Sequence, residues 1–383
     1  MFLLNRTEEL AAGDAALFSD KELALVRARL ACLPDFVPTP LHALPGLARA
    51  AGVGAIHIKD ESRRMKLGSF KALGGMHATL SLLLEAAGKA LACEPGWHEL
   101  YHPALRAALA SQTVCCATDG NHGRAVAAAA RLAGAQAHIF LHAGVSRQRL
   151  LAIRQYGAAV SIVRGTYDDA VAEARRTSAE RGWHLVSDTA WPGYERIPAR
   201  IMQGYTVLLD EALAEMAQPP SHLFVQAGVG GLAGALAARL ALRFGREQPR
   251  LIVVEPQRAA CLYASCLVRK PVSVDPGQPT VMAMLECYQP SLLAWRILAA
   301  TAHAFMTVDE ETARAAVLCL ERSASGDPRI PSSESGAAGL AGLLRAGAEP
   351  AMRSAFGLDR DSRVLLIASE GASEPIGQFR EPM

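Results

Sequence analysis

One lysine of the chain lies in a setting suited to carbonyl chemistry. Lys71 follows Gly68-Ser69-Phe70 and precedes Ala72-Leu73-Gly74-Gly75, at the expected start of a helix. A lysine whose pKa is lowered in a closed pocket can form a Schiff base with an aldehyde. A helix N-terminus lowers that pKa, because the helix dipole disfavours added positive charge. A solvated surface lysine is the alternative, but a position between Phe70 and two glycines is not typical of one.

Three further motifs follow expected strands, where ligands bind in open α/β sheets. The turn Thr118-Asp119-Gly120-Asn121-His122-Gly123 offers an asparagine that both donates and accepts, or else an ordinary helix cap. The glycines of Gln226-Ala227-Gly228-Val229-Gly230-Gly231-Leu232 let backbone N–H groups converge on a phosphate. Ser369-Glu370-Gly371 places a hydroxyl where it can bond a ring nitrogen, although such a turn is commonplace.

The glycine motif also admits a dinucleotide site. Gly228, Gly230 and Ala233 fit the pattern G-x-G-x-x-A, and Glu255 ends the next expected strand about 20 residues later. That hypothesis leaves the other three motifs unexplained. We therefore expect a phosphate-binding loop here and a structural role for Glu255.

Short strands are expected to alternate with Ala-rich helices. The expected strands are residues 55–60, 113–119, 135–141, 158–165, 184–188, 222–228, 251–256 and 364–371. Helices are expected at 122–135 and 232–245. This alternation predicts an α/β fold with parallel sheets and helices on both faces, so that each strand is apolar throughout.

Composition excludes several classes of protein. Of 383 residues, 51% are hydrophobic and 20% charged, which is not typical of a disordered chain. A net charge of +2 predicts no binding to nucleic acid or to anionic membranes. The longest apolar stretch is short and broken by glycines, and the first ten residues contain no signal-peptide core, so we expect a cytoplasmic protein. The eight cysteines form no C-x-x-C pair, so no metal is expected; most should be buried thiols, with Cys261 and Cys287 as candidates for pairing.

The four motifs, in this order, resemble those of the fold-type II pyridoxal-phosphate enzymes, the tryptophan synthase β family, over about residues 55–375. The resemblance implies two αβα domains with mostly parallel sheets and with pyridoxal 5′-phosphate in the cleft between them. It implies a discontinuous large domain, 1–84 and 191–383, and a small domain, 85–190. Implied cofactor contacts are Phe70, Lys71 as the Schiff base, Asn121 at the 3-hydroxyl, Gly228, Val229, Gly230, Gly231 and Leu232 at the phosphate, and Ser369 at the pyridine nitrogen.

Further motifs resemble those of the diaminopropionate ammonia-lyases within this family. They are Lys59-Asp60-Glu61-Ser62, Ser187-Asp188-Thr189-Ala190-Trp191-Pro192-Gly193-Tyr194, Ile197-Pro198, Met202-Gln203-Gly204-Tyr205, and Asp119 before Gly120-Asn121. The resemblance implies a carbon–nitrogen lyase of amino-acid catabolism. Its reaction is α,β-elimination of 2,3-diaminopropionate, D or L or both, to pyruvate and ammonia through an aminoacrylate intermediate.

Three residues are the catalytic candidates that this resemblance implies. Lys71 is expected to be the base for the L-enantiomer and Asp119 the base for the D-enantiomer, with Asp188 at the distal ammonium. Substrate contacts are expected from Thr118, Asp119, Gly120, His122 and Asp188. The expected partners are a small amino-acid substrate and a second copy of the chain in a homodimer.

Two departures leave the substrate range open. Cys287-Tyr288-Gln289-Pro290 stands where the subfamily is expected to have Cys-Gly-Glu-Pro, and Ala372 stands where a polar residue is usual. Asp188 has an alternative role as a helix cap. The alternatives for the whole chain are a serine/threonine dehydratase of the same fold and a non-catalytic ligand-binding relative.

Overall fold

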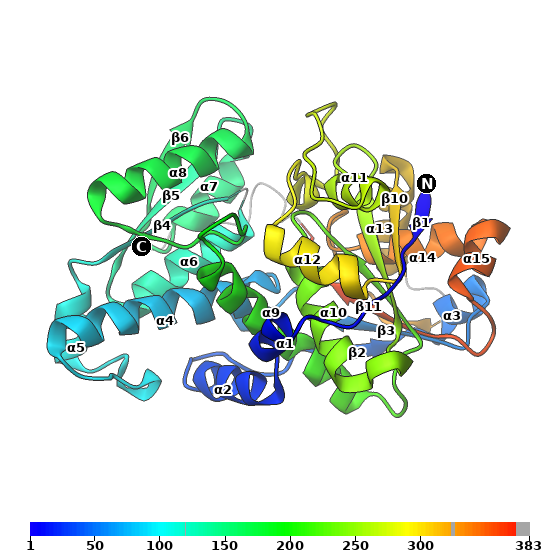
Figure 1. Ribbon diagram of the computed structural model, residues 1–383, viewed down its shortest axis with the longest axis horizontal. Coiled ribbons are helices and arrows are strands. Elements are labelled where there is room, and N and C mark those ends of the chain that lie inside the picture. The colour runs from blue at the N-terminus through cyan, green and yellow to red at the C-terminus, as the bar shows by residue number, and fades with distance from the viewer. Residues whose placement is uncertain (119, 323–325, 373–383) are drawn as a thin grey trace.

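The computed structural model describes residues 1–118, 120–322 and 326–372, which fold around two separate β-sheets (Figure 1). The larger sheet has the strand order β1-β10-β9-β8-β11-β3-β2, and the smaller has the order β6-β5-β4-β7. The pairings are parallel except at β1 and β2, the two edges of the larger sheet. This arrangement confirms the predicted α/β class with mostly parallel sheets.

The strands are short, as the sequence predicted. Those of the larger sheet are β1 (Phe2–Leu4), β2 (Leu41–Ala43), β3 (Ala55–Asp60), β8 (His222–Gln226), β9 (Arg250–Pro256), β10 (Ala304–Val308) and β11 (Arg363–Ala368). Those of the smaller sheet are β4 (Thr113–Ala117), β5 (Gln136–His142), β6 (Ala159–Val163) and β7 (His184–Leu185).

Helices connect the strands and cover both sheets. The α-helices are α1 (Ala12–Leu17), α2 (Asp20–Ala31), α3 (Pro45–Ala51), α4 (Lys71–Leu91), α5 (Pro103–Leu109), α6 (Asn121–Ala133), α7 (Arg147–Arg154), α8 (Tyr167–Arg181), α9 (Arg196–Glu215), α10 (Gly231–Phe244), α11 (Cys261–Val268), α12 (Leu292–Thr301), α13 (Glu310–Arg322), α14 (Ala338–Ala348) and α15 (Pro350–Phe356). Single 3-10 turns lie at Arg64–Lys66, Trp97–Glu99, Gly245–Glu247 and Ala283–Leu285.

Both faces of the larger sheet are buried. Along β8, Phe224 belongs to a core shared with α3, α13, α14 and α15, whereas its neighbours Leu223 and Val225 belong to a core shared with α9, α10 and α12. Successive side chains of a strand point to opposite faces. The continuous apolar character of these strands therefore reflects two cores, one on each side of the sheet.

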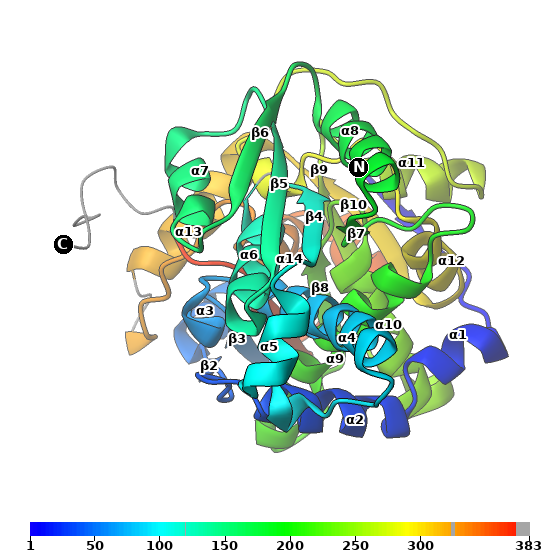
Figure 2. The same ribbon diagram turned by 90° about the vertical axis from the view of Figure 1, so that its left-hand side faces the viewer.

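The smaller sheet is covered in the same way. Cys115, Ala117 and Phe140 pack with Ala170 and Ala174 of α8, on the face opposite α6. Figure 2 shows this sheet from its own side, with α8 on one face and α6 and α7 on the other. The boundaries predicted for the two domains, after residues 84 and 190, stay a prediction.

Two glycines after Lys71 allow three helices to pack closely. A Cβ atom at Gly74 of α4 would overlap the backbone of α9, and one at Gly75 would overlap Ala125 of α6. On α9, Gly204 faces Gly74 in turn: a Cβ there would lie 2.6 Å from the Cα of Gly74. Because α4 begins at Lys71 and α6 begins at Asn121, this contact places the two N-termini side by side.

Three strands were absent from the sequence-based prediction. The edge strands β1 and β2 have three residues each, too few to show a pattern. The third, β10, is fully buried, but its sequence AFMTV follows the helix-forming run of α12 without a turn residue such as Gly or Pro. The predicted strand 184–188 is shorter than expected, because the chain leaves the sheet after Leu185.

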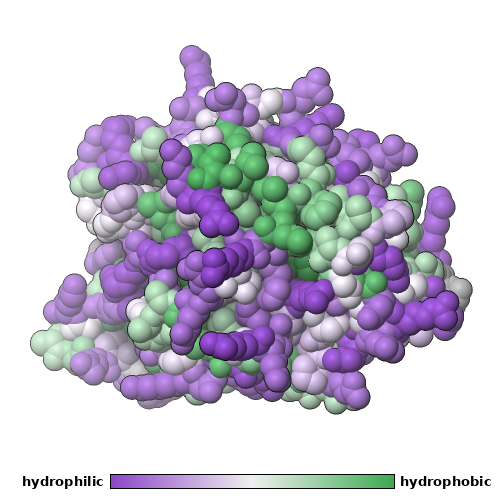
Figure 3. Space-filling view, turned by 45° about the vertical axis from the view of Figure 1, so that its right-hand side comes forward, coloured by the Kyte–Doolittle hydropathy of each residue, from purple (hydrophilic) through white to green (hydrophobic). Residues whose placement is uncertain are grey.

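The face of the molecule drawn in Figure 3 carries an apolar patch among hydrophilic residues. Among the large apolar side chains, Leu4 of β1 and Leu267 and Val268 of α11 are 59%, 63% and 49% exposed. No helix in the described part of the chain is long and apolar enough to cross a membrane.

Candidate active site

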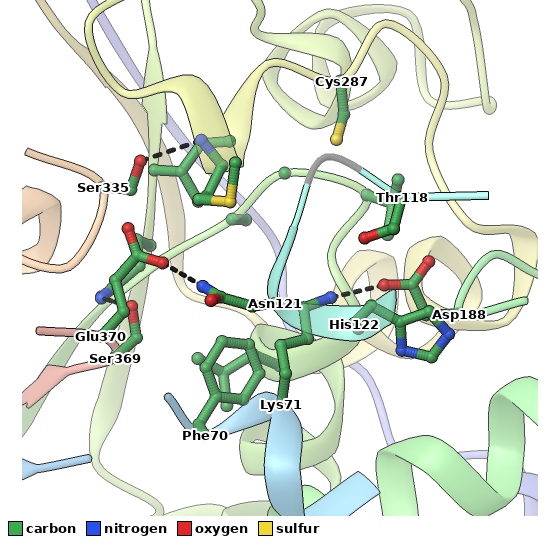
Figure 4. A pocket seen from close by; sticks show the side chains of 18 of the residues that line it. Phe70, Lys71, Thr118, Asn121, His122, Asp188, Cys287, Ser335, Ser369 and Glu370 are labelled. Carbon is green, nitrogen blue, oxygen red and sulfur yellow. Dashed lines mark hydrogen bonds and ion pairs between the residues drawn. The ribbon is translucent and has the colours of Figure 1, made fainter. Parts of the chain in front are cut away.

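A pocket lies where the carboxyl ends of strands from both sheets approach one another (Figure 4). Its walls come from the ends of β4, β8 and β11, the start of α4 and the segment after β7. The lining residues are Phe70, Lys71, Thr118, Gly120, Asn121, His122, Tyr167, Asp188, Gln226, Ala227, Gly228, Val229, Gly230, Gly231, Leu232, Met284, Leu285, Cys287, Ser335, Ser369 and Glu370. The four motifs predicted to carry chemistry therefore meet in one place.

Lys71 forms an ion pair with Asp188 inside this pocket. Its Nζ also lies 5.5 Å from the ring centroid of Phe70 and 5.9 Å from that of Tyr205. Burial opposes both charges, but the Lys71 ammonium lowers the pKa of Asp188 to about 2, and Asp188 raises the pKa of Lys71 above its usual range. The expectation that the pKa of Lys71 is lowered is wrong, because the Asp188 carboxylate pairs with the lysine and carries a full charge.

The segment that carries Asp188 is positioned by a tyrosine further along the chain. The hydroxyl of Tyr194 donates to the carbonyl of Leu185 at 2.7 Å and accepts from the N–H of Ser187 at 3.1 Å. The ring of Tyr194 stacks on Trp191, with centroids 4.3 Å apart. This geometry accounts for the spacing of the motif Ser187–Tyr194. Asp188 is not a helix cap, because it pairs with Lys71 and the next helix, α9, begins only at Arg196.

The turn before α6 presents Asn121 to the pocket. The hydroxyl oxygen of Thr118 accepts from the N–H groups of Gly120 at 3.0 Å and Gly123 at 3.2 Å. The Asn121 amide nitrogen donates to the carboxylate of Glu370. His122 is buried, and its Nε2 donates to the carbonyl of Val186 at 2.7 Å. Asp119, predicted to be catalytic, lies outside the described residues.

The glycine loop ends at the N-terminus of a long helix. Gly230, with φ of +97°, precedes α10, and the first residues of α10, Gly231 and Leu232, line the pocket. The first N–H groups of a helix have no acceptor within the helix, and the helix dipole makes this end attractive to an anion. A Cβ at Gly230 would press against Ala294, Leu262 and Leu298 at 3.2–3.3 Å, so the turn needs glycine for space as well as for its backbone angle.

Ser369 follows β11 and faces Gln226 at the end of β8. The Nε2 of Gln226 lies 2.8 Å from the Ser369 hydroxyl oxygen, 2.9 Å from the carbonyl oxygen of Ile367 and 3.0 Å from that of Gly336, and these three acceptors share its two hydrogens. The hydroxyl of Ser369 therefore accepts from Gln226 and keeps its own hydrogen for a partner in the pocket. Such a donor suits an unprotonated ring nitrogen.

Glu255 has a different environment from the one that a dinucleotide site requires. Its carboxylate is fully buried and accepts from the N–H groups of Leu262 at 2.8 Å and Tyr263 at 2.6 Å. Burial raises the pKa of Glu255 to about 8. Both oxygens serve the start of α11, so the side chain has the structural role predicted for it.

The pocket fits pyridoxal phosphate on its own chemistry. An amine for the aldehyde, a helix N-terminus for the phosphate, an amide for the ring hydroxyl and a hydroxyl donor for the ring nitrogen surround one space. A dinucleotide would use only the helix N-terminus and would leave the partly buried Lys71–Asp188 pair without a purpose.

Comparison with known proteins agrees with this chemistry. Residues 33–370 match the family model described as pyridoxal-phosphate dependent enzyme. The chain therefore belongs to the pyridoxal-phosphate-dependent enzymes, whose cofactor is pyridoxal 5′-phosphate.

Within that family, the chain is similar to particular lyases. It is 37% identical over 372 residues to the diaminopropionate ammonia-lyase of Escherichia coli strain K12, covering 95% of this chain and 92% of the relative. It is 38% identical to that of Salmonella typhimurium, covering 90% and 87%. The crystal structure of the E. coli enzyme with an aminoacrylate–pyridoxal-phosphate azomethine intermediate has a TM-score of 0.87 and 35% identity, covering 97% of this chain and 93% of that one. A crystal structure of the same enzyme with D-serine also has a TM-score of 0.87.

All the described residues that were predicted for the site line the pocket, and several lining residues were not predicted. The residues missed are Tyr167, Gln226, Ala227, Met284, Leu285, Cys287, Ser335 and Glu370. Gln226 and Glu370 lie inside two of the motifs but were passed over, because each adjoins a residue with a more obvious role. Met284 and Ser335 come from connecting segments with no pattern that marks them. No disulfide joins Cys261 and Cys287, so the pairing considered for them is not present.

Proposed function

We propose that the chain catalyses α,β-elimination of 2,3-diaminopropionate to pyruvate and ammonia. The observation that carries this proposal is the buried Asp188 carboxylate, which already holds the ammonium of Lys71. Such a carboxylate suits a substrate with a second ammonium at Cβ, whereas a hydroxyl-eliminating dehydratase has no cation to place there. The 37% and 38% identity to the two named lyases supports the same substrate.

Different residues of the pocket are assigned to different parts of the cofactor. Bound pyridoxal phosphate supplies the electron sink for the carbanion formed at Cα. We assign its phosphate to the N–H groups of Gly228–Leu232, its ring hydroxyl to Asn121 and its ring nitrogen to Ser369. Phe70 lies beside Lys71 and helps to exclude water from the lysine.

Among the described residues, we assign one side chain to proton transfer and one to the leaving group. Lys71, once free of the cofactor, accepts the Cα proton of the L-enantiomer at Nζ. Asp188 accepts a hydrogen bond from the Cβ nitrogen and holds it as it leaves. Asp119, assigned from sequence alone, takes the Cα proton of the D-enantiomer.

A substrate panel tests the proposal. Pyruvate and ammonia are measured with D- and L-diaminopropionate, D- and L-serine, and L-threonine. We expect turnover of diaminopropionate, with ammonia in twofold excess over pyruvate because both amino groups are lost. Equal amounts of ammonia and pyruvate from serine, without turnover of diaminopropionate, would reassign the chain to the dehydratases.

D-Serine is a second candidate substrate. The E. coli lyase has been crystallised with it, and serine carries a hydroxyl on Cβ where diaminopropionate carries its second amine. We expect slower turnover than with diaminopropionate, because a neutral hydroxyl gains less from the Asp188 carboxylate.

We also propose that the enzyme is a cytoplasmic homodimer. Leu4 of β1 and Leu267 and Val268 of α11 are exposed on two elements that contact each other, and they are candidates for its interface. Sedimentation analysis of the holoenzyme and of a Leu267→Glu variant tests this: a dimer that the substitution dissociates supports the proposal, and a monomeric wild-type enzyme overturns it.

A further inference from the structure

Glu370 lies at the wall of the pocket and touches the asparagine of the opposite wall (Figure 4). One carboxylate oxygen accepts from the Asn121 amide nitrogen, and the other accepts from the hydroxyl of Ser333. The side chain is 9% exposed. An ionised carboxylate only accepts hydrogen bonds, so it requires donors from both of these partners.

The backbone at Glu370 is tied to the turn that precedes Lys71. Glu370 pairs with Ser69 in an antiparallel bridge, and the N–H of Gly371 donates to the carbonyl of Gly68 at 3.1 Å. The hydroxyl of Ser332 donates to the Glu370 carbonyl at 3.0 Å. These contacts fix the backbone of Glu370, so its carboxylate is held in place where it accepts from the Asn121 amide.

The Glu370 carboxylate determines the orientation of the Asn121 amide. One N–H of its amide donates to Glu370, which leaves the second N–H and Oδ1 for other partners. A rotation of the amide by half a turn would set Oδ1 against the carboxylate, which is repulsive at a buried site. We propose that Glu370 is a positioning residue that fixes the amide of Asn121, so that its second N–H faces the ring hydroxyl of pyridoxal phosphate.

This proposal rests on the assignment of Asn121 to the cofactor. It does not depend on the substrate, because the interaction is complete before any amino acid binds. A direct role of Glu370 in proton transfer fits less well, since both of its oxygens already accept hydrogen bonds. Asn121 begins α6 beside the smaller sheet, whereas Glu370 follows β11 of the larger one, so their bond also couples the two sheets across the pocket.

A double-mutant cycle tests the proposal with the cofactor as the reporter. Glu370→Gln keeps the shape and removes the charge, and Asn121→Ala removes the group that is positioned. The dissociation constant of pyridoxal phosphate from each apo-protein is measured by fluorescence titration, and the visible absorbance band of each holo-protein is recorded. We expect Glu370→Gln to weaken cofactor binding about tenfold and to shift the band. In the Asn121→Ala background, the same change should cost less than about twofold.

Two further variants keep the test independent of folding. Ser333→Ala removes the other anchor of the carboxylate and should weaken cofactor binding in the same direction, by less. Glu334 follows Ser333 in the chain and does not line the pocket. Glu334→Gln makes the same chemical change there and should leave affinity and spectrum unchanged. Equal losses from Glu370→Gln with and without Asn121, or no loss of affinity and no spectral change, would overturn the proposal. If Glu370→Gln fails to fold, Ser333→Ala in the two backgrounds decides the question alone.

Discussion

Lys71 and Asp188 form an ion pair within the pocket although 117 residues separate them in the chain. The pair favours the protonated form of Lys71, because Asp188 raises the pKa of the lysine against the effect of burial. A protonated amine does not attack an aldehyde. Asp188 therefore opposes capture of the cofactor by the apo-enzyme, while we assign it a favourable role once a substrate ammonium replaces that of Lys71.

Asp188→Asn should separate these two effects. Without the carboxylate, Lys71 loses its proton more easily at neutral pH, so the apo-protein should capture pyridoxal phosphate faster. Turnover of diaminopropionate should instead fall about 10²–10⁴-fold. Stopped-flow absorbance measures the first rate and pyruvate formation the second. A slower capture together with slower turnover would mean that Asp188 is needed to build the pocket.

Lys71 should be the lysine that carries the cofactor. Borohydride reduction followed by peptide mapping should label Lys71 and neither of two nearby lysines. Lys59 is fully buried and pairs with Glu211 at 2.8 Å, and Lys66 is exposed and pairs with Asp35 at 2.6 Å. Lys71→Ala should abolish the label, and label at Lys59 or Lys66 would refute the assignment.

Stability should fall in mild acid because of a buried histidine. His77 is fully buried, its Nδ1 donates to the carbonyl of Arg200 at 3.0 Å, and its Nε2 faces the guanidinium of Arg29 at 3.4 Å. Burial, aided by the charges of Arg29 and Arg200, lowers the pKa of His77 to about 4. Between its unfolded value of about 6.5 and about 4, the unfolded chain binds more protons, so the free energy of unfolding decreases as pH falls, by up to about 3 kcal/mol.

His77→Gln tests this pH dependence. Glutamine can keep the donor to Arg200 and the acceptor for Arg29, but it does not titrate. Urea unfolding of the apo-protein at about pH 7.5 and about pH 5 should show a smaller acid loss in the variant than in the wild type. An unchanged difference between the two pH values would assign the acid sensitivity to other groups, such as His303, whose pKa burial also lowers to about 4.

Arg64, which precedes the turn that carries Lys71, should contribute strongly to the stability of the protein. It is fully buried, and it pairs with Glu61 at 2.7 Å and with Glu211 of α9 at 2.6 Å. Arg64→Met leaves two buried carboxylates without that partner and should reduce the free energy of unfolding by about 3–5 kcal/mol. Arg27 of α2 forms a half-exposed pair with Asp210, the neighbour of Glu211 on α9. Arg27→Met removes this pair and should reduce the free energy of unfolding by at most about 1 kcal/mol. Equal losses in urea denaturation would contradict this difference.

Asp119 remains a prediction from the sequence alone. Asp119→Asn preserves the shape of the side chain and removes the proposed base for the D-enantiomer. We expect about 10²–10⁴-fold slower turnover of D-diaminopropionate, with a smaller loss on the L-enantiomer. Steady-state rates with each enantiomer measure this. An equal loss on both would make Asp119 a general substrate anchor, and no loss would make it a helix cap.

The sequence predicted the parts of the site that depend on backbone shape. The glycines at 228–231, the asparagine turn and the lysine before Gly74-Gly75 each require a particular local geometry, and that requirement is visible in residue type and spacing. The contacts of Glu370 with Asn121 and Ser333 were not predictable in this way, since they join residues 249 and 37 positions apart. For the same reason the pKa of Lys71 was predicted with the wrong sign: the helix start is local, but Asp188 is not.

The close packing of α4 against α6 and α9 has a consequence for how this scaffold can diversify. Positions 74, 75 and 204 do not admit even one added methyl group without moving a helix. The helices that position Lys71 therefore tolerate few substitutions at their contacts. The segment with Met284, Leu285 and Cys287 closes another wall of the pocket and belongs to no α-helix or strand. New substrate preferences should therefore accumulate in residues 284–290, where Tyr288 and Gln289 differ from the pattern expected from the sequence, while the reaction itself stays the same.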